Sequence, residues 1–314
     1  MSPKPLTFAI SLSPYERWGG IPAIAEAARL ADELGFWGIH FPEHIIMPTR
    51  PGAERFRTLW YDNFVLGAHL ATVTRRVRLI FGVMVVPYRP PVQTAKLIAT
   101  LDQVSGGRLV VGVGAGWLRG EFRTLGIPFA ERGDMTDEYL RAMKALWTQE
   151  SPSFGGKYVA FSNIAFEPQC VQKPHVPIWV GGSGPKPMRR VVELGDGWSP
   201  MTGELADLKN DVAKLKEMVR AAGRDPEQMD FAYRFAVGGD DPDRERSRQH
   251  VVKANYVPTK NATTPEEIIE AIGVHREAGF NHLCIDFTWS TPAELMRHME
   301  SFAAKVMPKV TVSS

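Results

Sequence analysis

The feature that most constrains the fold is a regular alternation of short apolar runs and segments with helical spacing, repeated eight times. Runs that are apolar at nearly every position predict strands buried on both faces of a parallel sheet covered by helices. Eight such units favour a closed (β/α)8 barrel over an open doubly wound sheet. We therefore expect a single α/β domain over residues 1–314. The expected strands are 6–12, 36–41, 77–86, 109–114, 177–181, 197–199, 231–237 and 282–287.

The segments between these strands carry helix start and stop signals. Pro22 suits the first turn of a helix, and Gly35 suits its C-terminal cap. The stretches 264–267 and 291–294 both read Thr-Pro-x-Glu, a capping-box sequence that satisfies N–H groups at a helix start. The expected helices cover 22–34, 63–72, 91–104, 135–148, a segment ending at 192, 204–222, a segment ending near 279, and a last one opening at 291.

Three stretches interrupt the alternation. Residues 42–61 follow the second strand and residues 240–263 follow the seventh, so both belong on the C-terminal face, where barrel enzymes build their sites. We expect both to be lids that become ordered when a cofactor binds. Residues 149–176 precede a strand and are expected on the opposite face, with a structural role.

Composition narrows the possible partners and the compartment. The chain has 37 Lys and Arg against 35 Asp and Glu, so its bulk charge does not indicate nucleic-acid binding. Hydrophobic residues make up 44%, which argues against disorder. Cys170 and Cys284 lie far apart, with no C-x-x-C spacing. The start lacks a signal-peptide pattern, and no apolar run approaches the roughly 20 residues of a membrane span. We expect a cytoplasmic protein.

One motif suggests zinc and is set aside. Residues 40–44 read His-Phe-Pro-Glu-His, which matches a zinc-binding H-x-x-E-H pattern. That pattern needs a helix to place both histidines on one face, whereas here a strand runs into it and Pro42 lies inside it. No metal site is predicted.

A second motif resembles a dinucleotide fingerprint without satisfying it. In Gly112-Val-Gly-Ala-Gly-Trp117 the third glycine of G-x-G-x-x-G falls at Trp117, which is too large for close packing. The glycines still indicate a close backbone approach, either to a bound group or to a neighbouring strand. Gly114, Gly116 and Trp117 are therefore candidate cofactor residues.

An anion site is predicted where the fifth strand meets its helix. Gly181, Gly182, Ser183 and Gly184 follow the strand and open the helix, and successive N–H groups in such a place bind phosphate. Lys186 adds a positive charge. The alternative is a flexible turn without a ligand.

His44 stands just beyond the second strand, on the expected catalytic face. A histidine there is a candidate general acid or base. The alternative is a loop histidine bonded to the backbone. Glu43 is either its partner or a solvated side chain. Trp60 and Trp117 fall near the same face, where they would line a site for a flat ring.

The sequence resembles the luciferase-like flavin oxidoreductases, and within them the coenzyme F420-dependent class. The resemblance extends over about residues 6 to 306. It is carried by Pro42-Glu-His44, Gly112-Val-Gly-Ala-Gly-Trp117 and Gly195-Asp-Gly-Trp198, together with segments 27–36, 94–108 and 172–183. Each motif is weak alone, and their order and spacing together are strong.

The resemblance implies FMN or F420 in the mouth of a barrel. The phosphate would lie at Gly182, Ser183, Gly184 and Lys186. The ring would rest against the end of the third strand, where a non-proline cis peptide is expected between Val83 and Met84. His44 would contact the ring edge and move a proton during hydride transfer. A homodimer is also implied, built through helices of the first half.

Departures from the family limit the substrate. Ala115 stands where the luciferase branch has an arginine for the phosphate. Sugar-phosphate dehydrogenases of the F420 class carry a glutamate shortly after the glycines, whereas here Glu121 lies further along. Neither aldehyde luminescence nor a sugar-phosphate substrate is expected.

The sequence thus predicts an F420-dependent oxidoreductase acting on a small organic substrate. The first alternative is an FMN-dependent two-component monooxygenase. The second, from another class, is a non-catalytic flavin-binding barrel. The candidates to bind the anionic tail of F420 are Arg50, Arg55 and Arg57. Their presence favours F420 over FMN.

Overall fold

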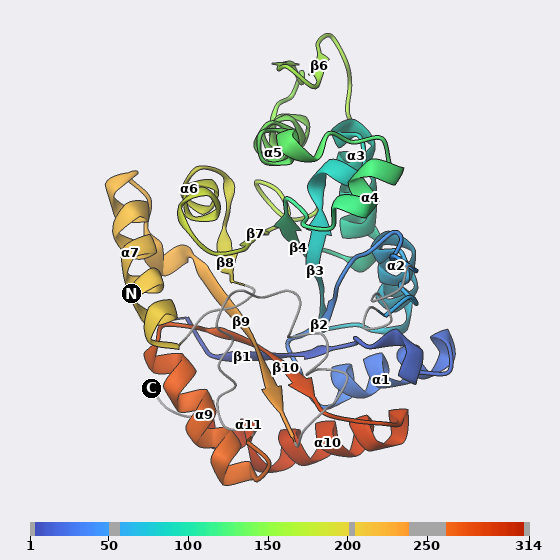
Figure 1. Ribbon diagram of the computed structural model, residues 1–314, viewed down its shortest axis with the longest axis vertical. Coiled ribbons are helices and arrows are strands. Elements are labelled where there is room, and N and C mark those ends of the chain that lie inside the picture. The colour runs from blue at the N-terminus through green and yellow to red at the C-terminus, as the bar shows by residue number, and fades with distance from the viewer. Residues whose placement is uncertain (1–3, 50–56, 201–204, 239–261, 311–314) are drawn as a thin grey trace.

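All eight expected strands form and pair in parallel around a closed barrel (Figure 1). The computed structural model describes residues 4–49, 57–200, 205–238 and 262–310. Neighbouring strands follow the order β1-β10-β9-β8-β7-β4-β3-β2, which confirms the predicted (β/α)8 architecture. The strands are β1 (Thr7–Ser11), β2 (Gly38–Phe41), β3 (Arg78–Val85), β4 (Leu109–Gly114), β7 (Ile178–Gly181), β8 (Gly197–Ser199), β9 (Asp230–Val237) and β10 (His282–Phe287).

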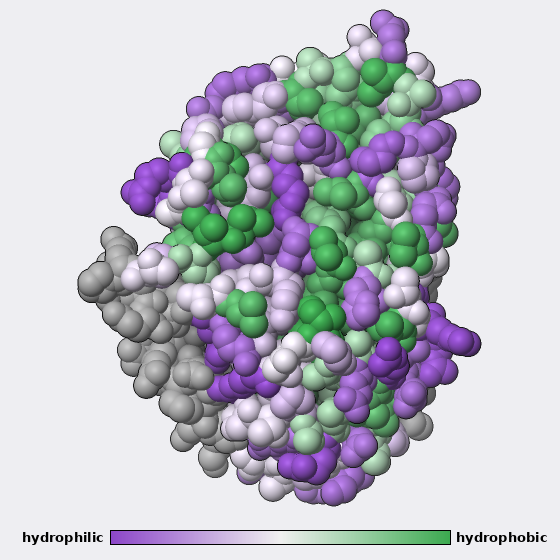
Figure 2. Space-filling view, turned by 90° about the vertical axis from the view of Figure 1, so that its right-hand side faces the viewer, coloured by the Kyte–Doolittle hydropathy of each residue, from purple (hydrophilic) through white to green (hydrophobic). Residues whose placement is uncertain are grey.

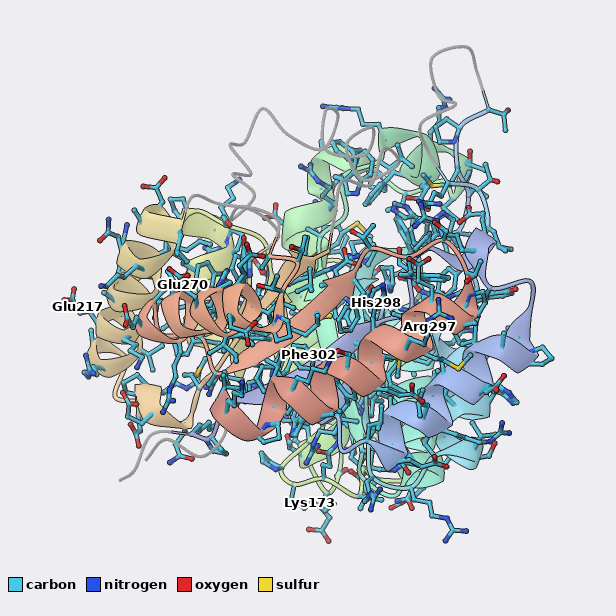
Figure 3. All side chains as sticks on the ribbon, turned by 90° about the horizontal axis from the view of Figure 1, so that it is seen from below. Lys173, Glu217, Glu270, Arg297, His298 and Phe302 are labelled. Carbon is cyan, nitrogen blue, oxygen red and sulfur yellow. The ribbon has the colours of Figure 1, made fainter. Side chains whose placement is uncertain are left out.

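The expected helices surround the barrel and bury their apolar faces against it. Phe302, labelled in Figure 3, packs from α10 against Phe8 of β1 and Phe287 of β10, with ring centroids 5.2 and 5.8 Å apart. The helices are α1 (Ile21–Glu33), α2 (Asn63–Val73), α3 (Pro91–Ser105), α5 (Arg132–Thr148), α6 (Pro185–Leu194), α7 (Leu205–Ala221), α9 (Pro265–Glu277) and α10 (Pro292–Lys305).

Several short elements were not predicted. A small hairpin, β5 (Phe154–Gly155) with β6 (Ala160–Phe161), lies outside the barrel in the 149–176 stretch. Glu138 of α5 holds it by accepting hydrogen bonds from the backbone N–H groups of 157–159. The other short elements are α4 (Arg119–Thr124), α11 (Met307–Val310), η1 (Tyr15–Arg17), η2 (Val86–Tyr88), η3 (Phe129–Glu131) and η4 (Pro226–Gln228). Of these, α4 and η2 become important at the site.

The two capping-box sequences behave differently. At α9 both halves form: Thr264 accepts from the Glu267 N–H, and the Glu267 carboxylate accepts from the Thr264 N–H. At α10 Thr291 caps Glu294, but the Glu294 carboxylate accepts from Ser290 instead, at 2.8 Å. The second prediction is therefore right about the helix start and wrong about the reciprocal bond, because the glutamate reaches one residue further back.

The end of β3 carries a bulge beside β4. Pairing between these strands shifts register between Phe81 and Met84, and the peptide bond Gly82–Val83 is cis. The predicted bond, Val83–Met84, is therefore wrong by one residue. Gly82, the first residue of this bond, packs against the ring of His40 with no room for a Cβ. Among the described residues no helix is long and apolar enough to cross a membrane.

Gly112 is required by this bulge. A Cβ at Gly112 would lie 2.1 Å from the carbonyl oxygen of Phe81, a backbone atom on the neighbouring strand. We predict that Gly112→Ala lowers the free energy of unfolding by at least about 1–3 kcal/mol, measured by urea denaturation. The control is Gly273→Ala in α9, where nothing lies within 4 Å and alanine should stabilise the helix by up to about 1 kcal/mol. Equal midpoints for both variants would contradict this account of the bulge.

Candidate active site

The predicted catalytic and cofactor-binding residues lie at or just beyond the C-terminal ends of barrel strands. His44 follows β2, Val83 and Met84 lie in β3, and Gly114 ends β4. Gly116 and Trp117 come directly after it, and the stretch 181–186 links β7 to α6. This is the face on which (β/α)8 enzymes carry their sites.

Glycines let inward-facing side chains pack closely against the strands at this end of the barrel. A Cβ on Gly82 would lie 1.7 Å from Nε2 of His40, and one on Gly114 would lie 2.8 Å from Cγ2 of Val83. The Val83 side chain also lies 3.0 Å from where a Cβ of Gly181 would be. Val83, Gly114 and Gly181, all predicted to bind the cofactor, therefore meet at one place.

Two other predicted cofactor residues, Gly116 and Met84, pack against other parts of the protein. Gly116 has a φ of +79°, and a Cβ there would lie 2.7 Å from both Phe122 and Val85. Its glycine is explained by close packing against α4. The side chain of Met84 is buried in the core between the sheet and the helices, so it does not face the barrel interior.

His44 is bonded to a buried carboxylate. Its Nδ1 lies 2.9 Å from Oε2 of Glu121, which α4 carries and which is completely buried. Tyr88, at the end of η2, donates its hydroxyl to the same oxygen at 2.6 Å. The backbone N–H groups of Ile45 and Ile46 donate to the other oxygen at 2.7 and 3.3 Å. One carboxylate thus joins the β2 loop, η2 and α4.

The surroundings of Glu121 keep it ionised. Burial raises its pKa, but the hydrogen bonds from His44, Tyr88 and Ile45 outweigh burial and hold the pKa below its ordinary value. An ionised carboxylate only accepts hydrogen bonds, so Nδ1 of His44 carries a hydrogen. A neutral His44 therefore has its lone pair on Nε2, which is the arrangement of a general base.

Two tryptophans hold the His44 ring. Trp60 lies at 4.6 Å between ring centroids and Trp117 at 5.8 Å, both with their planes steeply inclined to the imidazole. Trp60 is fixed in turn by a 2.9 Å hydrogen bond from its Nε1 to the Arg57 carbonyl. Trp117 is 39% exposed, so it presents an aromatic surface beside His44. Both predicted aromatic residues therefore border the candidate base.

Glu43 is not the partner of His44, and it is not solvated. It is 4% exposed, accepts the Val85 N–H at 2.7 Å and lies 2.7 Å from Nη1 of Arg89. Arg89 also pairs with Asp62, the N-cap residue of α2, at 2.8 Å. Both alternatives considered for Glu43 are therefore wrong, because the carboxylate is needed inside to neutralise Arg89.

The H-x-x-E-H residues are separated by these contacts. His44 faces Glu121, Glu43 faces Arg89, and His40 lies inside the barrel against Gly82. Among the described residues no group of three or more His, Cys, Asp or Glu side chains is arranged to hold a metal ion.

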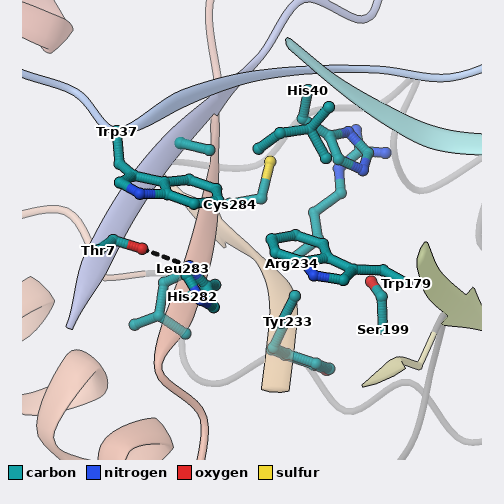
Figure 4. Close-up of a pocket in the computed structure, with 13 residues that line it drawn as sticks. Thr7, Trp37, His40, Trp179, Ser199, Tyr233, Arg234, His282, Leu283 and Cys284 are labelled. Carbon is teal, nitrogen blue, oxygen red and sulfur yellow. Dashed lines mark hydrogen bonds between the residues drawn. The ribbon is translucent and has the colours of Figure 1, made fainter. Parts of the chain in front are cut away.

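The barrel interior contains polar side chains. His40 and Arg234 line the same small cavity there (Figure 4), and Arg234 pairs with Asp286 at 2.8 Å. Burial and the charge of Arg234 lower the pKa of His40 to about 3, so this histidine is neutral at physiological pH. Within the described part of the chain, Ser11 Oγ, Tyr15 OH and His40 Nδ1 are buried polar atoms without a hydrogen bond. A cavity of about 20 Å³ is lined by His40, Trp37 and Trp179 and has room for about one water.

The predicted anion site is an uncapped helix start. Gly184 is the N-cap residue of α6, with a φ of +92° and no side-chain cap. Gly182 is held by a 2.8 Å hydrogen bond from Trp198 Nε1 to its carbonyl. Lys186 is exposed and forms no ion pair with any described residue. The first turn offers fewer N–H groups than most helices, because Pro185 and Pro187 have none.

These features fit a flat ring that carries a phosphate chain. Glycines bring Val83 and His40 close to the neighbouring strands, and buried polar atoms nearby lack partners within the described residues. The uncapped helix start and Lys186 suit an anion at the rim. Gly182, Ser183, Gly184 and Lys186 would hold the phosphate, and Val83, Gly114 and Gly181 would border the ring.

The loop arginines expected to bind an anionic tail are only partly placed. Arg57 is paired with Glu16 at 3.6 Å, so it is not an isolated cation. Arg50 and Arg55 lie outside the described residues. So do residues 50–56 of the predicted lid over 42–61 and residues 240–261 of the predicted lid over 240–263, both of which were expected to become ordered on binding.

Sequence reasoning missed four members of this region. In the sequence Glu121 stands out only as a departure from the family, and Tyr88, Arg234 and Asp286 are not predicted members. Arg234 and Asp286 carried a usable signal, since each interrupts an otherwise apolar strand. Glu121 had no such signal, because α4 was not predicted.

Comparisons with known proteins agree with this fold. The family model described as luciferase-like monooxygenase matches residues 8–303. Over 215 residues the chain is 38% identical to an uncharacterized protein of Mycobacterium tuberculosis, covering 64% of this chain and 75% of that protein. It is 30% identical over 199 residues to an FMNH2-dependent dimethylsulfone monooxygenase of Pseudomonas putida, covering 62% of this chain and 53% of that protein.

A solved structure shares the fold over nearly the whole chain. It is an F420-dependent secondary alcohol dehydrogenase in complex with an F420–acetone adduct. It matches with a TM-score of 0.80 and 23% identity, and covers 98% of this chain and 99% of its own.

The Glu121 carboxylate should stabilise the fold in a pH-dependent way. The pKa of Glu121 in the folded protein lies below the ordinary 4.5. Its contribution to the free energy of unfolding is therefore present above pH 4.5 and is lost as the pH falls through the folded pKa. Glu121→Gln should lower the free energy of unfolding at pH 7 by about 1.5–3 kcal/mol, with a smaller difference at pH 3.5. Chemical denaturation at both pH values measures this. The control is Glu217→Gln, an exposed glutamate on α7. A difference that is the same at both pH values would contradict an ionised Glu121.

Proposed function

We propose a function on the premise that the chain belongs to the luciferase-like monooxygenase family, whose model matches residues 8–303. The proposed function is hydride transfer between coenzyme F420 and a small organic substrate. The observation that carries it is the hydrogen bond between His44 Nδ1 and the buried Glu121 carboxylate, which leaves Nε2 as a base. Hydride transfer to or from a carbon that bears oxygen needs such a proton carrier.

When bound, the deazaflavin ring supplies or accepts the hydride. His44 holds the proton: Nε2 removes it from a substrate hydroxyl during oxidation and returns it to the carbonyl oxygen during reduction. Glu121 stabilises the imidazolium that forms, as the carboxylate does in other His–carboxylate pairs. Tyr88 positions Glu121 through its 2.6 Å hydrogen bond. Trp60 and Trp117 exclude water around the imidazole.

FMN is the second candidate cofactor, and a specific observation favours it. The named relative at 30% identity is an FMNH2-dependent monooxygenase, although the match spans about half of that protein. In support of F420, a neighbour with the same fold is F420-dependent. FMN and F420 share a ribityl phosphate, so the anion site serves both. The remaining alternative, a flavin-binding barrel without catalysis, leaves the lone pair of His44 Nε2 without a role.

Cofactor preference is tested by titration. Purified protein is titrated separately with F420 and with FMN, and binding is followed by the change in cofactor fluorescence. We predict that F420 binds more tightly than FMN. Tight binding of FMN with weak binding of F420 would favour the FMN-dependent monooxygenase over the F420-dependent enzyme. Binding of neither cofactor would overturn the proposed function.

The same titration tests the phosphate site. Ser183→Ala and Lys186→Ala should each lower the affinity for the preferred cofactor. The double variant should lower it by about ten- to hundredfold, with an unchanged melting temperature. Lys209→Ala, an exposed lysine on α7, is the matched control. A shift in melting temperature without a change in affinity would make the turn purely structural.

His44→Phe tests the proton role, because phenylalanine keeps the ring volume and removes both nitrogens. With an alcohol or ketone substrate identified by screening, turnover should fall by about 10²–10⁴-fold while the cofactor dissociation constant changes little. His69→Phe, an exposed histidine on α2, is the control. Turnover that survives while cofactor affinity falls would make His44 a binding residue instead.

The proposed assembly is a homodimer formed through α2 and α3. Exposed apolar side chains gather on these helices and beside them: Val65 at 73%, Val104 at 48%, Val171 at 44%, Leu97 at 40% and Val92 at 37%. Figure 2 views the side of the molecule that carries α2 and shows apolar side chains among polar ones across it. An apolar surface of this kind is typical of a protein interface.

Sedimentation velocity tests this assembly. We predict a dimer for the native chain and a monomer for the double variant Val65→Lys with Leu97→Lys. Val274→Lys, at an equally exposed apolar position on α9, should leave the dimer intact. A monomeric native chain at micromolar concentration would rule the assembly out.

A further inference from the structure

Exposed apolar side chains gather around the candidate base. The described residues include ten large apolar side chains that are exposed, and five of them belong to the proposed dimer surface. Four of the other five come from the segments that hold the His44 ring: Ile45 at 40%, Ile46 at 39%, Leu59 at 38% and Trp117 at 39%. We call these four residues the apolar rim.

Contacts to His44 bring the apolar rim together from separate parts of the chain. Trp117, between β4 and α4, lies 5.8 Å from the His44 ring between centroids. Leu59 directly precedes Trp60, whose ring lies 4.6 Å from the same imidazole. The other two members directly follow His44 in the chain. Single exposed apolar residues are ordinary on a protein surface, whereas a gathering of four beside one histidine indicates a binding surface.

The backbone N–H groups of this surface are already bonded. Those of Ile45 and Ile46 donate to Oε1 of Glu121 at 2.7 and 3.3 Å. The N–H of Leu59 donates to the carboxylate of Glu16 at 3.0 Å. These three donors are therefore not available to a substrate, which meets the hydrocarbon side chains of the same residues instead.

The charge beside His44 disfavours an anionic substrate. The ionised carboxylate of Glu121 is completely buried and lies 2.9 Å from Nδ1 of His44. While the imidazole is neutral, the pair carries one negative charge, which repels a carboxylate placed beside it. The apolar rim also offers such a group no partner to replace its hydration. The side chain of His44 is 13% exposed, so the imidazole is open to a ligand.

We propose that the substrate is an uncharged ketone with an apolar chain, or the corresponding secondary alcohol, which lies on the apolar rim with its oxygen at Nε2 of His44. The inference rests on the proposed hydride transfer and names the substrate class for it. In the reduction, the carbonyl carbon accepts the hydride from the reduced cofactor and the oxygen accepts the proton from His44. The products are the secondary alcohol and the oxidised cofactor. Each methylene that leaves water for the rim should strengthen binding by about two- to fourfold.

Binding is measured at His44 itself, without turnover. Protein labelled with ¹⁵N-histidine and free of cofactor is titrated with 2-butanone, 2-octanone and 7-oxooctanoate, at a pH where the imidazole is neutral. The ring signals of His44 are followed by NMR. 2-Octanone has four more methylenes than 2-butanone and should bind at least about tenfold more tightly. The signals of His298, on α10 outside the barrel, should not move (Figure 3).

The third ligand tests the charge preference. 7-Oxooctanoate is 2-octanone with a carboxylate in place of the terminal methyl group. It should bind at least about tenfold more weakly than 2-octanone, because its charge loses hydration on an apolar surface. In enzyme that turns over, kcat/KM for the three ligands should follow the same order.

Variants of the apolar rim test its side chains. The double variant Ile46→Ser with Leu59→Ser should reduce the advantage of 2-octanone over 2-butanone to less than about threefold. Leu59→Met, which keeps an apolar side chain, should retain the advantage. Val274→Ser, at an equally exposed position on α9, is the matched control. Should the double variant not fold, as judged by circular dichroism, Leu59→Ser alone is measured, and the advantage should still fall.

The possible failures are distinguishable. Equal dissociation constants for the two ketones, or tighter binding of 7-oxooctanoate, would overturn the inference. His44 signals that no ketone moves would overturn it as well. Native protein that binds 2-octanone at His44 but neither F420 nor FMN would instead overturn the proposed function and leave the apolar rim as a binding surface.

Discussion

The carboxylate of Glu121 accepts hydrogen bonds from two segments and lies on a third, and the shape of the barrel mouth depends on this connection. His44 and the backbone of Ile45 belong to the loop after β2, Tyr88 ends η2, and Glu121 itself lies on α4. A buried carboxylate left without these partners would be strongly unfavourable, so all of them must be in place together. The ionisation that results fixes the hydrogen of His44 on Nδ1. Structure and proposed chemistry thus share one interaction.

A second constraint shapes the space beside this carboxylate. The bulge at the end of β3 brings the Phe81 carbonyl so close to β4 that only glycine fits at position 112. The same bulge presents Val83 to the interior, where Gly114 and Gly181 leave room for it. Met84, the next residue, turns outward into the core. The wall of the barrel is therefore closely packed around Val83.

The sequence was sufficient to predict the barrel and insufficient to predict the contacts inside its mouth. The eight apolar runs and the capping signals at Thr264 and Thr291 are local patterns, so they survive without knowledge of tertiary structure. His44 was found because it directly follows a strand. Its partner lies 77 residues away, on a helix of six residues with no clear start signal, so no local pattern connects them. Glu43 was misjudged for the same reason, because Arg89 reaches it only in the folded barrel.

The central claim is that Glu121 holds His44 as a base with its lone pair on Nε2. The most direct measurement is the tautomer of His44, read from two-bond ¹⁵N–¹H NMR correlations of protein labelled with ¹⁵N-histidine and assigned with His44→Phe. The account predicts the Nδ1–H form at a pH where the ring is neutral, and loss of that preference in Glu121→Gln. A neutral His44 with its hydrogen on Nε2, in the native protein, would contradict it.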